Sequence, residues 1–153
     1  PYVAVKTYRR KFEVDIAEAL ISEYDIVLDG TDNFNTRYMV NRACVVQKVP
    51  LVSGALTQWE GQLSVFDPDQ SGPCYQCVFP EVPNAEIAGT GAQVGVFSAL
   101  PGVIGSLMAG EALKYLLDAG KPLRGKLAIY NILDAETRVI STNVAADCPI
   151  CQS

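Results

Sequence analysis

Four of the five cysteines fall into two closely spaced pairs, the strongest indication of chemistry in the sequence. Cys74 and Cys77 form a C-x-x-C motif in the middle of the chain, and Cys148 and Cys151 form a second one near its end. Each motif can supply two sulfur ligands from a tight turn, and two such motifs supply the four thiolates that surround zinc tetrahedrally. The spacing therefore predicts a structural zinc site that joins the end of the chain to its middle.

Two other interpretations of these cysteines are a redox-active pair and two disulfides. A thioredoxin-like C-x-x-C opens a helix after a strand, whereas the first pair lies in "GPCYQCVFP", between Gly72-Pro73 and Pro80. No signal-peptide pattern opens the sequence, so we expect a cytoplasmic protein, whose reducing surroundings disfavour structural disulfides. Zinc is favoured, and because four thiolates leave no position for water, we expect no catalysis from it.

A group of acids and amides follows a short apolar run in "YDIVLDGTDNFNTR", residues 24–37. Residues 26–28 predict a strand buried on both faces. Ligands of open α/β sheets bind beyond the carboxyl ends of the strands, which is where Asp29, Asp32 and Asn33 fall. A carboxylate there can hold hydrated Mg²⁺ against a nucleotide phosphate. Such residues also form turns readily, and the residues alone leave both interpretations open.

Two neighbours of this stretch have possible chemical roles. Arg37 could reach a phosphate or pair with an acid such as Asp29, and the ion pair is favoured. Cys44 lies among apolar residues, where a small buried hydrophobe is favoured over a nucleophile. The chain contains no histidine, which excludes Cys-His and Ser-His-Asp catalysis within it.

The elements that must position these residues alternate between strand and helix in the first half. We expect a strand at Tyr2–Lys6, a helix from Asp15, the strand at 26–28, a helix capped by Asn35 or Thr36 and ending near Lys48, and a strand from Val49. This alternation predicts a parallel sheet. Later, "GQLSVF", "KLAIYNI" and "TRVISTNV" predict antiparallel strands, the last two joined around residues 134–136.

Bulk composition limits the class of protein. With 153 residues, 49% of them hydrophobic, the chain suits one domain with a sizeable core. The net charge of −5 and the scattered basic residues argue against nucleic-acid binding. Residues 88–110 carry no charge, but their glycines and Pro101 favour a glycine-rich loop that leads into a deeply buried helix over a membrane span.

Six segments in order resemble the MoeB/ThiF family of adenylyltransferases, which are related to the ubiquitin-activating enzymes. They are "DIVLDGTDNFNTR", "VPLVSGA", "WEGQLSVF", "PCYQCVFP", "GVIGSLMAGEALKYL" and the terminal "CPIC". The resemblance covers essentially the whole chain, residues 1–153. It implies an α/β fold: the C-terminal part of a Rossmann-like doubly wound sheet, extended by antiparallel strands and carrying a four-cysteine zinc site.

The resemblance also implies an activity and a site. Family members use ATP and Mg²⁺ to adenylate the C-terminal Gly-Gly carboxylate of a ubiquitin-like sulfur carrier for molybdopterin or thiamine synthesis, and act as homodimers. By resemblance, Asp32 matches the aspartate of the Mg²⁺ and phosphate site, and Asn33 and Arg37 belong to the same nucleotide-binding stretch. The four paired cysteines match the zinc ligands. Attack of a carboxylate on the α-phosphate of ATP needs positioning and charge neutralisation, for which no histidine is required.

The chain also departs from the family pattern. No G-x-G-x-x-G nucleotide loop occurs, and Gly89, Gly91 and Gly95 give only a look-alike without a preceding strand. The chain is thus expected to be part of a longer protein and inactive alone. Gly91, beside Thr90, stands where many relatives carry a reactive cysteine, so adenylation is expected without a covalent intermediate there.

Trp59, Phe66 and Phe79 could face the carrier or fill the core, and the sequence favours neither reading. The competing function is a non-catalytic, zinc-stabilised module that binds a ubiquitin-like carrier. A dinucleotide-dependent oxidoreductase is disfavoured, because the chain has neither that fingerprint nor a histidine proton donor.

Overall fold

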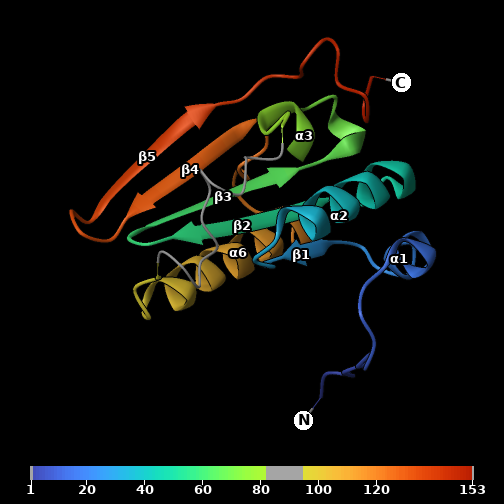
Figure 1. Cartoon of the computed structure of the whole chain (residues 1–153), viewed down its shortest axis with the longest axis horizontal. Coiled ribbons are helices and arrows are strands. Elements are labelled where there is room, and N and C mark those ends of the chain that lie inside the picture. The colour runs from blue at the N-terminus through green and yellow to red at the C-terminus, as the bar shows by residue number, and fades with distance from the viewer. Residues whose placement is uncertain (1, 82–94, 153) are drawn as a thin grey trace.

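The structure is a computed structural model that describes residues 2–81 and 95–152, built around a five-stranded sheet (Figure 1). The strands lie side by side in chain order: β1 Val27–Asp29, β2 Leu51–Thr57, β3 Glu60–Phe66, β4 Lys126–Asn131 and β5 Glu136–Ser141. The described helices are α1 Val14–Ile21, α2 Phe34–Gln47, α3 Tyr75–Val78 and α6 Leu100–Leu116, with a 3-10 turn, η1, at Pro68–Gln70.

Strand directions divide the sheet into two parts. β1 and β2, joined through α2, are parallel, and each later neighbour pairs antiparallel. The expected antiparallel extension is confirmed, and the expected parallel pairing is confirmed for β1 and β2. The hairpin of β4 and β5 turns at residues 132–135, as expected from the sequence.

Two cores form because side chains on a strand alternate between the faces of a sheet. Leu51 and its register partner Phe66 face the core that includes α1 and α2. The next pair, Val52 and Val65, faces the core that includes α6. Helices α1 and α2 therefore cover one face, and α6 covers the other.

Helix α6 lies close against β2 and β3 because two glycines leave room for it. Ile104 and Met108 are buried on its sheet side. A Cβ atom at Gly54 would collide with Met108, and one at Gly61 would collide with Ile104. The expectation of a deeply buried helix holds for this side only, because Leu107 and other outward residues are exposed. No helix in the described segments is long and apolar enough to cross a membrane.

The first expected strand is wrong. Tyr2–Lys6 forms no strand, and its apolar side chains are open to solvent, with Val3 83% and Val5 81% exposed. Alternating apolar residues form a strand only against a neighbouring strand, and within the described residues none pairs with this segment. The expected helix after it is present, as α1.

The strand expected at residues 26–28 is displaced by one residue and is buried less completely than expected. Leu28 is 45% exposed because β1 pairs with a neighbour on one side only in the described sheet. The helix after it begins earlier than expected: Asn33 is the N-cap, so Asn35 and Thr36 lie inside α2. Lys48 ends α2 in a left-handed conformation, two residues before Pro50.

Candidate functional site

The four paired cysteines converge on one point of the structure. All four sulfur atoms lie within 4.8 Å of one another. The Sγ atoms of Cys74 and Cys148 are 3.6 Å apart, and those of Cys77 and Cys151 are 3.3 Å apart. Four sulfurs at about 2.3 Å from a tetrahedral zinc would be about 3.8 Å apart, so this cluster fits the ion.

The first C-x-x-C motif is placed by α3. Cys74 is the N-cap of this short helix, and Cys77 donates its backbone N–H to the carbonyl oxygen of Cys74 at 3.1 Å. The second motif lies in consecutive turns near the C-terminus, where Gln152 N–H donates to Cys148 O at 3.2 Å. Each motif thus turns both of its sulfurs toward the other.

Asn41 of α2 supports the cluster from the side. It is buried at 1% exposure, and its Nδ2 donates to Cys74 Sγ at 3.7 Å. Its Oδ1 accepts the backbone N–H of Tyr75 at 2.9 Å, which fixes the start of α3. Partners of this kind orient metal ligands. Sequence analysis did not identify Asn41, although it lies four residues after Arg37 on the buried stripe of α2, where an amide needs partners.

Burial and hydrogen bonding shift the pKa values of these thiols in opposite directions. Burial raises the pKa of Cys74 above its ordinary value. Burial also acts on Cys148, but hydrogen bonds from the backbone N–H groups of Cys151 and Ile150 and with the Cys77 and Cys151 side chains together outweigh it and lower the pKa of Cys148 to about 7. The described cysteines are all free, and the four paired ones form one cluster rather than two separate pairs. That arrangement suits a four-thiolate metal site better than the redox or disulfide alternatives.

The acidic stretch forms a loop between β1 and α2. Asp29 ends β1, is 3% exposed and accepts the backbone N–H of Thr31 on its Oδ1 at 2.8 Å. Asp32 is exposed in this loop, and Asn33 Oδ1 accepts the backbone N–H of Thr36 at 2.9 Å. Asp29 and Asn33 therefore form the expected turns of this loop, and the Asp32 carboxylate is exposed, so its ligand role stays a prediction.

Arg37 reaches back under this loop from the first turns of α2. It is 6% exposed, and its guanidinium donates to the carbonyl oxygens of Thr31 and Gly54, the latter at 2.9 Å, and to Ser53 Oγ at 3.4 Å. The favoured ion pair with Asp29 is wrong, since within residues 2–81 and 95–152 Arg37 pairs with no acid. A planar fork of donors suits several oxygens at once, and carbonyl groups of the loop and of β2 supply them here.

Two buried oxygens beside this loop lack partners. Asp29 Oδ2 and Thr31 Oγ1 make no hydrogen bond in the described structure. Such atoms cost free energy unless a ligand or water satisfies them. These two acceptors lie on the loop that exposes the Asp32 carboxylate, and that carboxylate can contact a cation or a polar ligand.

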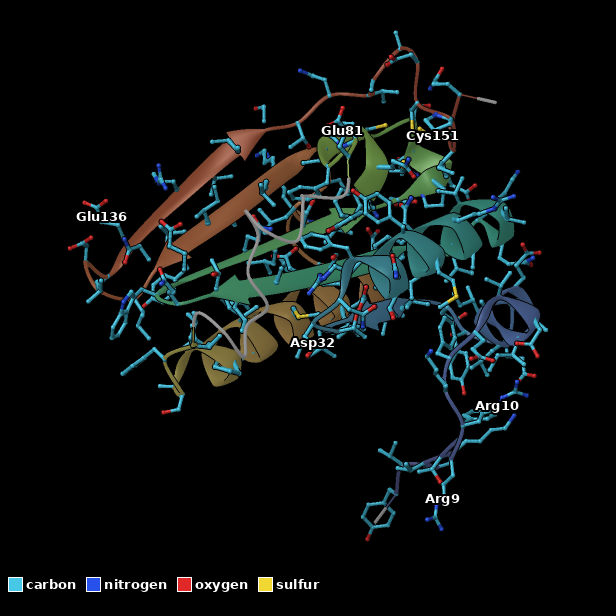
Figure 2. All side chains as sticks on the ribbon, viewed as in Figure 1. Arg9, Arg10, Asp32, Glu81, Glu136 and Cys151 are labelled. Atoms are coloured by element: carbon cyan, nitrogen blue, oxygen red, sulfur yellow. The ribbon has the colours of Figure 1, made fainter. Side chains whose placement is uncertain are left out.

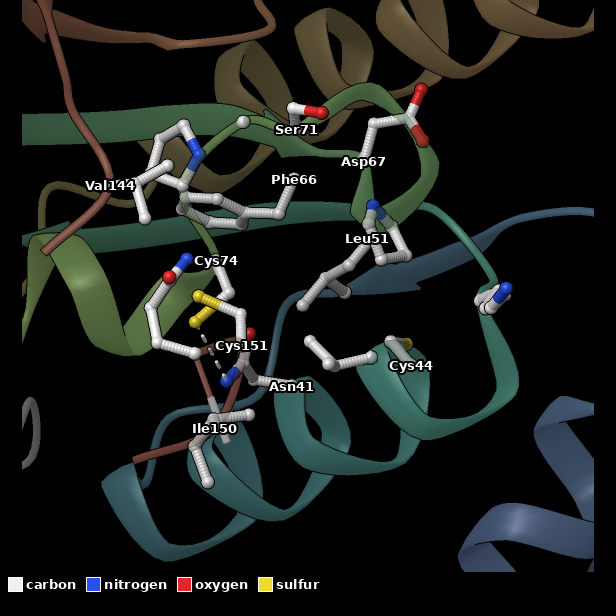
Figure 3. Close-up of a pocket in the computed structure, with 16 residues that line it drawn as sticks. Asn41, Cys44, Leu51, Phe66, Asp67, Ser71, Cys74, Val144, Ile150 and Cys151 are labelled. Carbon is white, nitrogen blue, oxygen red and sulfur yellow. Dashed lines mark hydrogen bonds between the residues drawn. The ribbon is translucent and has the colours of Figure 1, made fainter. Parts of the chain in front are cut away.

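The loop and the cysteine cluster are separate sites, as the labelled Asp32 and Cys151 in Figure 2 show. A cavity of about 390 Å³ lies beside the cysteines (Figure 3), lined by Asn41, Leu51, Phe66, Cys74 and Cys151 among others. Asp32 and Arg37 do not line it. Helix α2 connects the two sites, because its buried stripe carries Arg37 to the loop and Asn41 to the cysteines.

The other candidate residues divide between core and surface. Cys44 is buried at 1% exposure, as expected, and burial raises its pKa to about 12, so it is poorly suited to act as a nucleophile. Phe66 is in the core, and Phe79 packs against it. Trp59 is 41% exposed and lies against Phe97, with ring centroids 5.2 Å apart. Thr90 and Gly91, like Gly89, fall outside the described residues.

Known proteins match the chain along its length. The ThiF family matches residues 1–150. The "Sulfur carrier protein adenylyltransferase" of Thermus thermophilus is 44% identical over 155 residues, which cover 99% of this chain and 57% of the relative. The "SAMP-activating enzyme E1" of Haloferax volcanii is 38% identical over 151 residues, covering 99% of this chain and 55% of that protein. The chain spans about half the length of these two relatives.

A solved structure shows the same fold. The crystal structure of E. coli MccB superposes with a TM-score of 0.69 at 18% identity, covering 84% of this chain and 40% of that chain. A second crystal structure, of E. coli MccB with ATP, gives a TM-score of 0.69 at 19% identity over 83% of this chain and 39% of that one. At this level of identity the match establishes the arrangement of strands and helices alone.

Proposed function

The chain belongs to the ThiF family, and we propose that it is part of an ATP-dependent adenylyltransferase. The proposed substrate is the C-terminal Gly-Gly carboxylate of a ubiquitin-like sulfur carrier. The observation that carries this proposal is the identity of 44% with a protein named "Sulfur carrier protein adenylyltransferase", which extends over 99% of this chain. The exposed Asp32 carboxylate at the carboxyl end of a parallel strand supports it, because nucleotides bind at that edge of such sheets.

The proposed reaction is a nucleotidyl transfer. An oxygen of the carrier's terminal carboxylate forms a bond to the α-phosphorus of ATP, the bond to the bridging oxygen breaks, and pyrophosphate leaves with that electron pair. Positioning and charge neutralisation are the main requirements of such a step. The product is an acyl-adenylate. Attack of a sulfide-level sulfur nucleophile on its carbonyl carbon would break the bond to the phosphate oxygen, release AMP and leave the thiocarboxylate.

Asp32 is proposed to hold Mg²⁺ at the phosphates. When bound, the ion would neutralise phosphate charge. Asn33 is proposed to serve the same nucleotide site through its cap, which places the amino end of α2 beside Asp32, where unpaired N–H groups and the helix dipole favour a phosphate. Arg37 is proposed as a nucleotide-site residue that acts from beneath the loop, since its guanidinium is occupied by carbonyl oxygens.

The cluster of Cys74, Cys77, Cys148 and Cys151 is proposed to hold a structural zinc ion that ties the last turns to α3. A cytoplasmic location is proposed with it, because a reducing compartment keeps the four thiols available for metal. Molybdopterin and thiamine synthesis are the proposed pathways, and the carrier would come from one of them.

A homodimer is proposed for the whole protein. Its support is the outward side of α6, where Leu107 is 45%, Leu113 56% and Leu116 52% exposed. Of the residues in α6, Glu111 and Lys114 alone are charged, and Glu111 is buried. Apolar helix surfaces of this kind are commonly covered by another protein surface.

The test is pyrophosphate exchange into ATP by the full-length protein, with a carrier ending in Gly-Gly. We expect exchange that requires the intact carrier tail and Mg²⁺, and an Asp32→Asn variant should lose most of it. Absence of exchange from the full-length protein with its own carrier would contradict the adenylyltransferase. Carrier binding in calorimetry without any response to ATP would instead favour a zinc-stabilised binding module.

A further inference from the structure

We propose that Asp29 and Arg37 are positioning residues that hold Thr31 from both sides and thereby set the position of Asp32 for its cation and phosphate. This inference rests on the proposed function. Thr31 is the residue immediately before Asp32, so the two share a peptide group. Hydrogen bonds that fix the N–H and the C=O of Thr31 therefore also fix the backbone that carries the Asp32 carboxylate.

The first contact comes from the strand. Asp29 ends β1, and β1 is held by parallel pairing to β2, in which Asp29 stands beside Ser53. Its Oδ1 accepts the N–H of Thr31 at 2.8 Å. A carboxylate acceptor makes a stronger hydrogen bond than a neutral one, and burial at 3% exposure strengthens it further. This contact fixes the amino side of Thr31 relative to the sheet.

The second contact comes from the helix. Arg37 donates from Nη2 to the carbonyl oxygen of Thr31, and from Nη1 to Gly54 O at 2.9 Å and to Ser53 Oγ at 3.4 Å. One guanidinium thus joins the loop, the helix that carries it and the neighbouring strand. Lysine could not replace it, because a single ammonium group lacks the planar fork that spans these acceptors.

These contacts also explain why two charged groups are buried so near an exposed one. Arg37 is 6% and Asp29 3% exposed, and burying a charged side chain costs free energy unless its polar atoms are satisfied. This cost in free energy is consistent with a site that needs fixed geometry. Asp29 Oδ2 and Thr31 Oγ1 retain acceptor capacity without a partner in the described structure, on the same loop that presents Asp32.

The test uses the full-length protein and compares Arg37→Lys and Asp29→Ala with Asp29→Asn. Asp29→Asn keeps an acceptor oxygen for the N–H of Thr31, whereas Asp29→Ala removes it. Arg10→Gln is the matched control, because Arg10 is exposed and pairs with Asp15 at 3.0 Å on the surface. The readouts are the Mg²⁺ concentration for half-maximal pyrophosphate exchange, the melting temperature and hydrogen exchange of the peptide that spans residues 30–36.

We expect the Mg²⁺ requirement to rise on the order of tenfold in Arg37→Lys and Asp29→Ala, as for outer partners of metal ligands. It should rise less in Asp29→Asn, which keeps a weaker, neutral acceptor for the N–H of Thr31, and change little in Arg10→Gln. Hydrogen exchange of residues 30–36 should quicken in the first two variants. An unchanged Mg²⁺ requirement with a lowered melting temperature would overturn the positioning role and leave Arg37 and Asp29 with a role in stability alone.

The two proposals fail in different ways. If the unmodified full-length protein shows no pyrophosphate exchange, the adenylyltransferase proposal is wrong. Hydrogen exchange then still decides whether Asp29 and Arg37 hold the loop. Equal exchange rates at residues 30–36 in all variants would then overturn the inference. Should Arg37→Lys fail to fold, Asp29→Ala tests how Thr31 is held from its amino side.

Discussion

The Sγ atoms of Cys77 and Cys151 lie 3.3 Å apart, although 74 positions separate the two residues in the chain. A metal ion at this point would close a loop that includes α6, β4 and β5, and loop closure of this kind removes conformational freedom from the unfolded chain. The four-cysteine cluster is therefore expected to contribute to stability rather than to catalysis.

Removal of one sulfur ligand should destabilise the protein strongly. Structural zinc in small domains supplies on the order of 10 kcal/mol, and a loss of 1 kcal/mol lowers the melting temperature of a domain this size by roughly 2–4 °C. We expect Cys151→Ser to bind less than one zinc per chain. A chelator should lower the melting temperature of the unmodified protein and should hardly change the melting temperature of the variant. Metal analysis and thermal melts measure both.

The control is Cys44→Ala, which removes a buried thiol outside the cluster and should keep full zinc content. A chelator-insensitive melting curve for the zinc-loaded protein would count against the site.

A methyl group at position 61 should loosen the contact between α6 and the sheet. The added Cβ of Gly61→Ala would meet Ile104, a β-branched residue that is 2% exposed and has little room to move. We expect a loss of about 1–3 kcal/mol, the usual range for overpacking, measured by chemical denaturation. The second substitution Ile104→Val should restore part of it. Equal stability of Gly61→Ala and the unmodified protein would show that α6 can shift freely.

Gly110→Ala serves as the comparison in the same helix. A Cβ at this exposed position meets nothing within 4 Å. Alanine forms helix better than glycine, so this variant should be stabilised by up to about 1 kcal/mol.

The sequence predicted the cysteine cluster because ligand spacing is itself a local pattern, whereas the geometry around Arg37 depends on tertiary contacts. An arginine near two aspartates suggests an ion pair, yet the Arg37 guanidinium donates to the carbonyl oxygens of residues 31 and 54. Backbone acceptors of this kind cannot be predicted from a pattern of side chains. The strand predicted at Tyr2–Lys6 is wrong for a related reason, since a strand forms only when a neighbouring strand pairs with it. The strand predicted from the apolar alternation of β3 is confirmed, because elements of the described chain bury both of its faces.

Cys44 should resist alkylation in the native protein. Burial raises its pKa to about 12, so near pH 8 the reactive thiolate is a very small fraction, and 1% exposure blocks the reagent as well. We expect mass spectrometry after iodoacetamide treatment to find Cys44 unmodified until the protein is unfolded. As the pH rises toward 12 the thiolate fraction increases, but access still limits the reaction. Labelling of Cys44 in the native state as fast as in a short peptide would contradict its placement in the core.

Asn33 should act as a helix cap independently of any role at the phosphate. Its Oδ1 accepts the N–H of Thr36, and Asn33→Ala would leave that group without a side-chain partner at a cost of about 1 kcal/mol. Asn33→Asp keeps the acceptor and adds a negative charge that the amino end of α2 favours, so its stability should match or exceed that of the unmodified protein. The same charge would repel a phosphate, so pyrophosphate exchange should fall in Asn33→Asp despite its stability. Denaturation and exchange measured on both variants separate the cap from the nucleotide site, and a stable Asn33→Asp protein with full exchange would place the phosphate elsewhere.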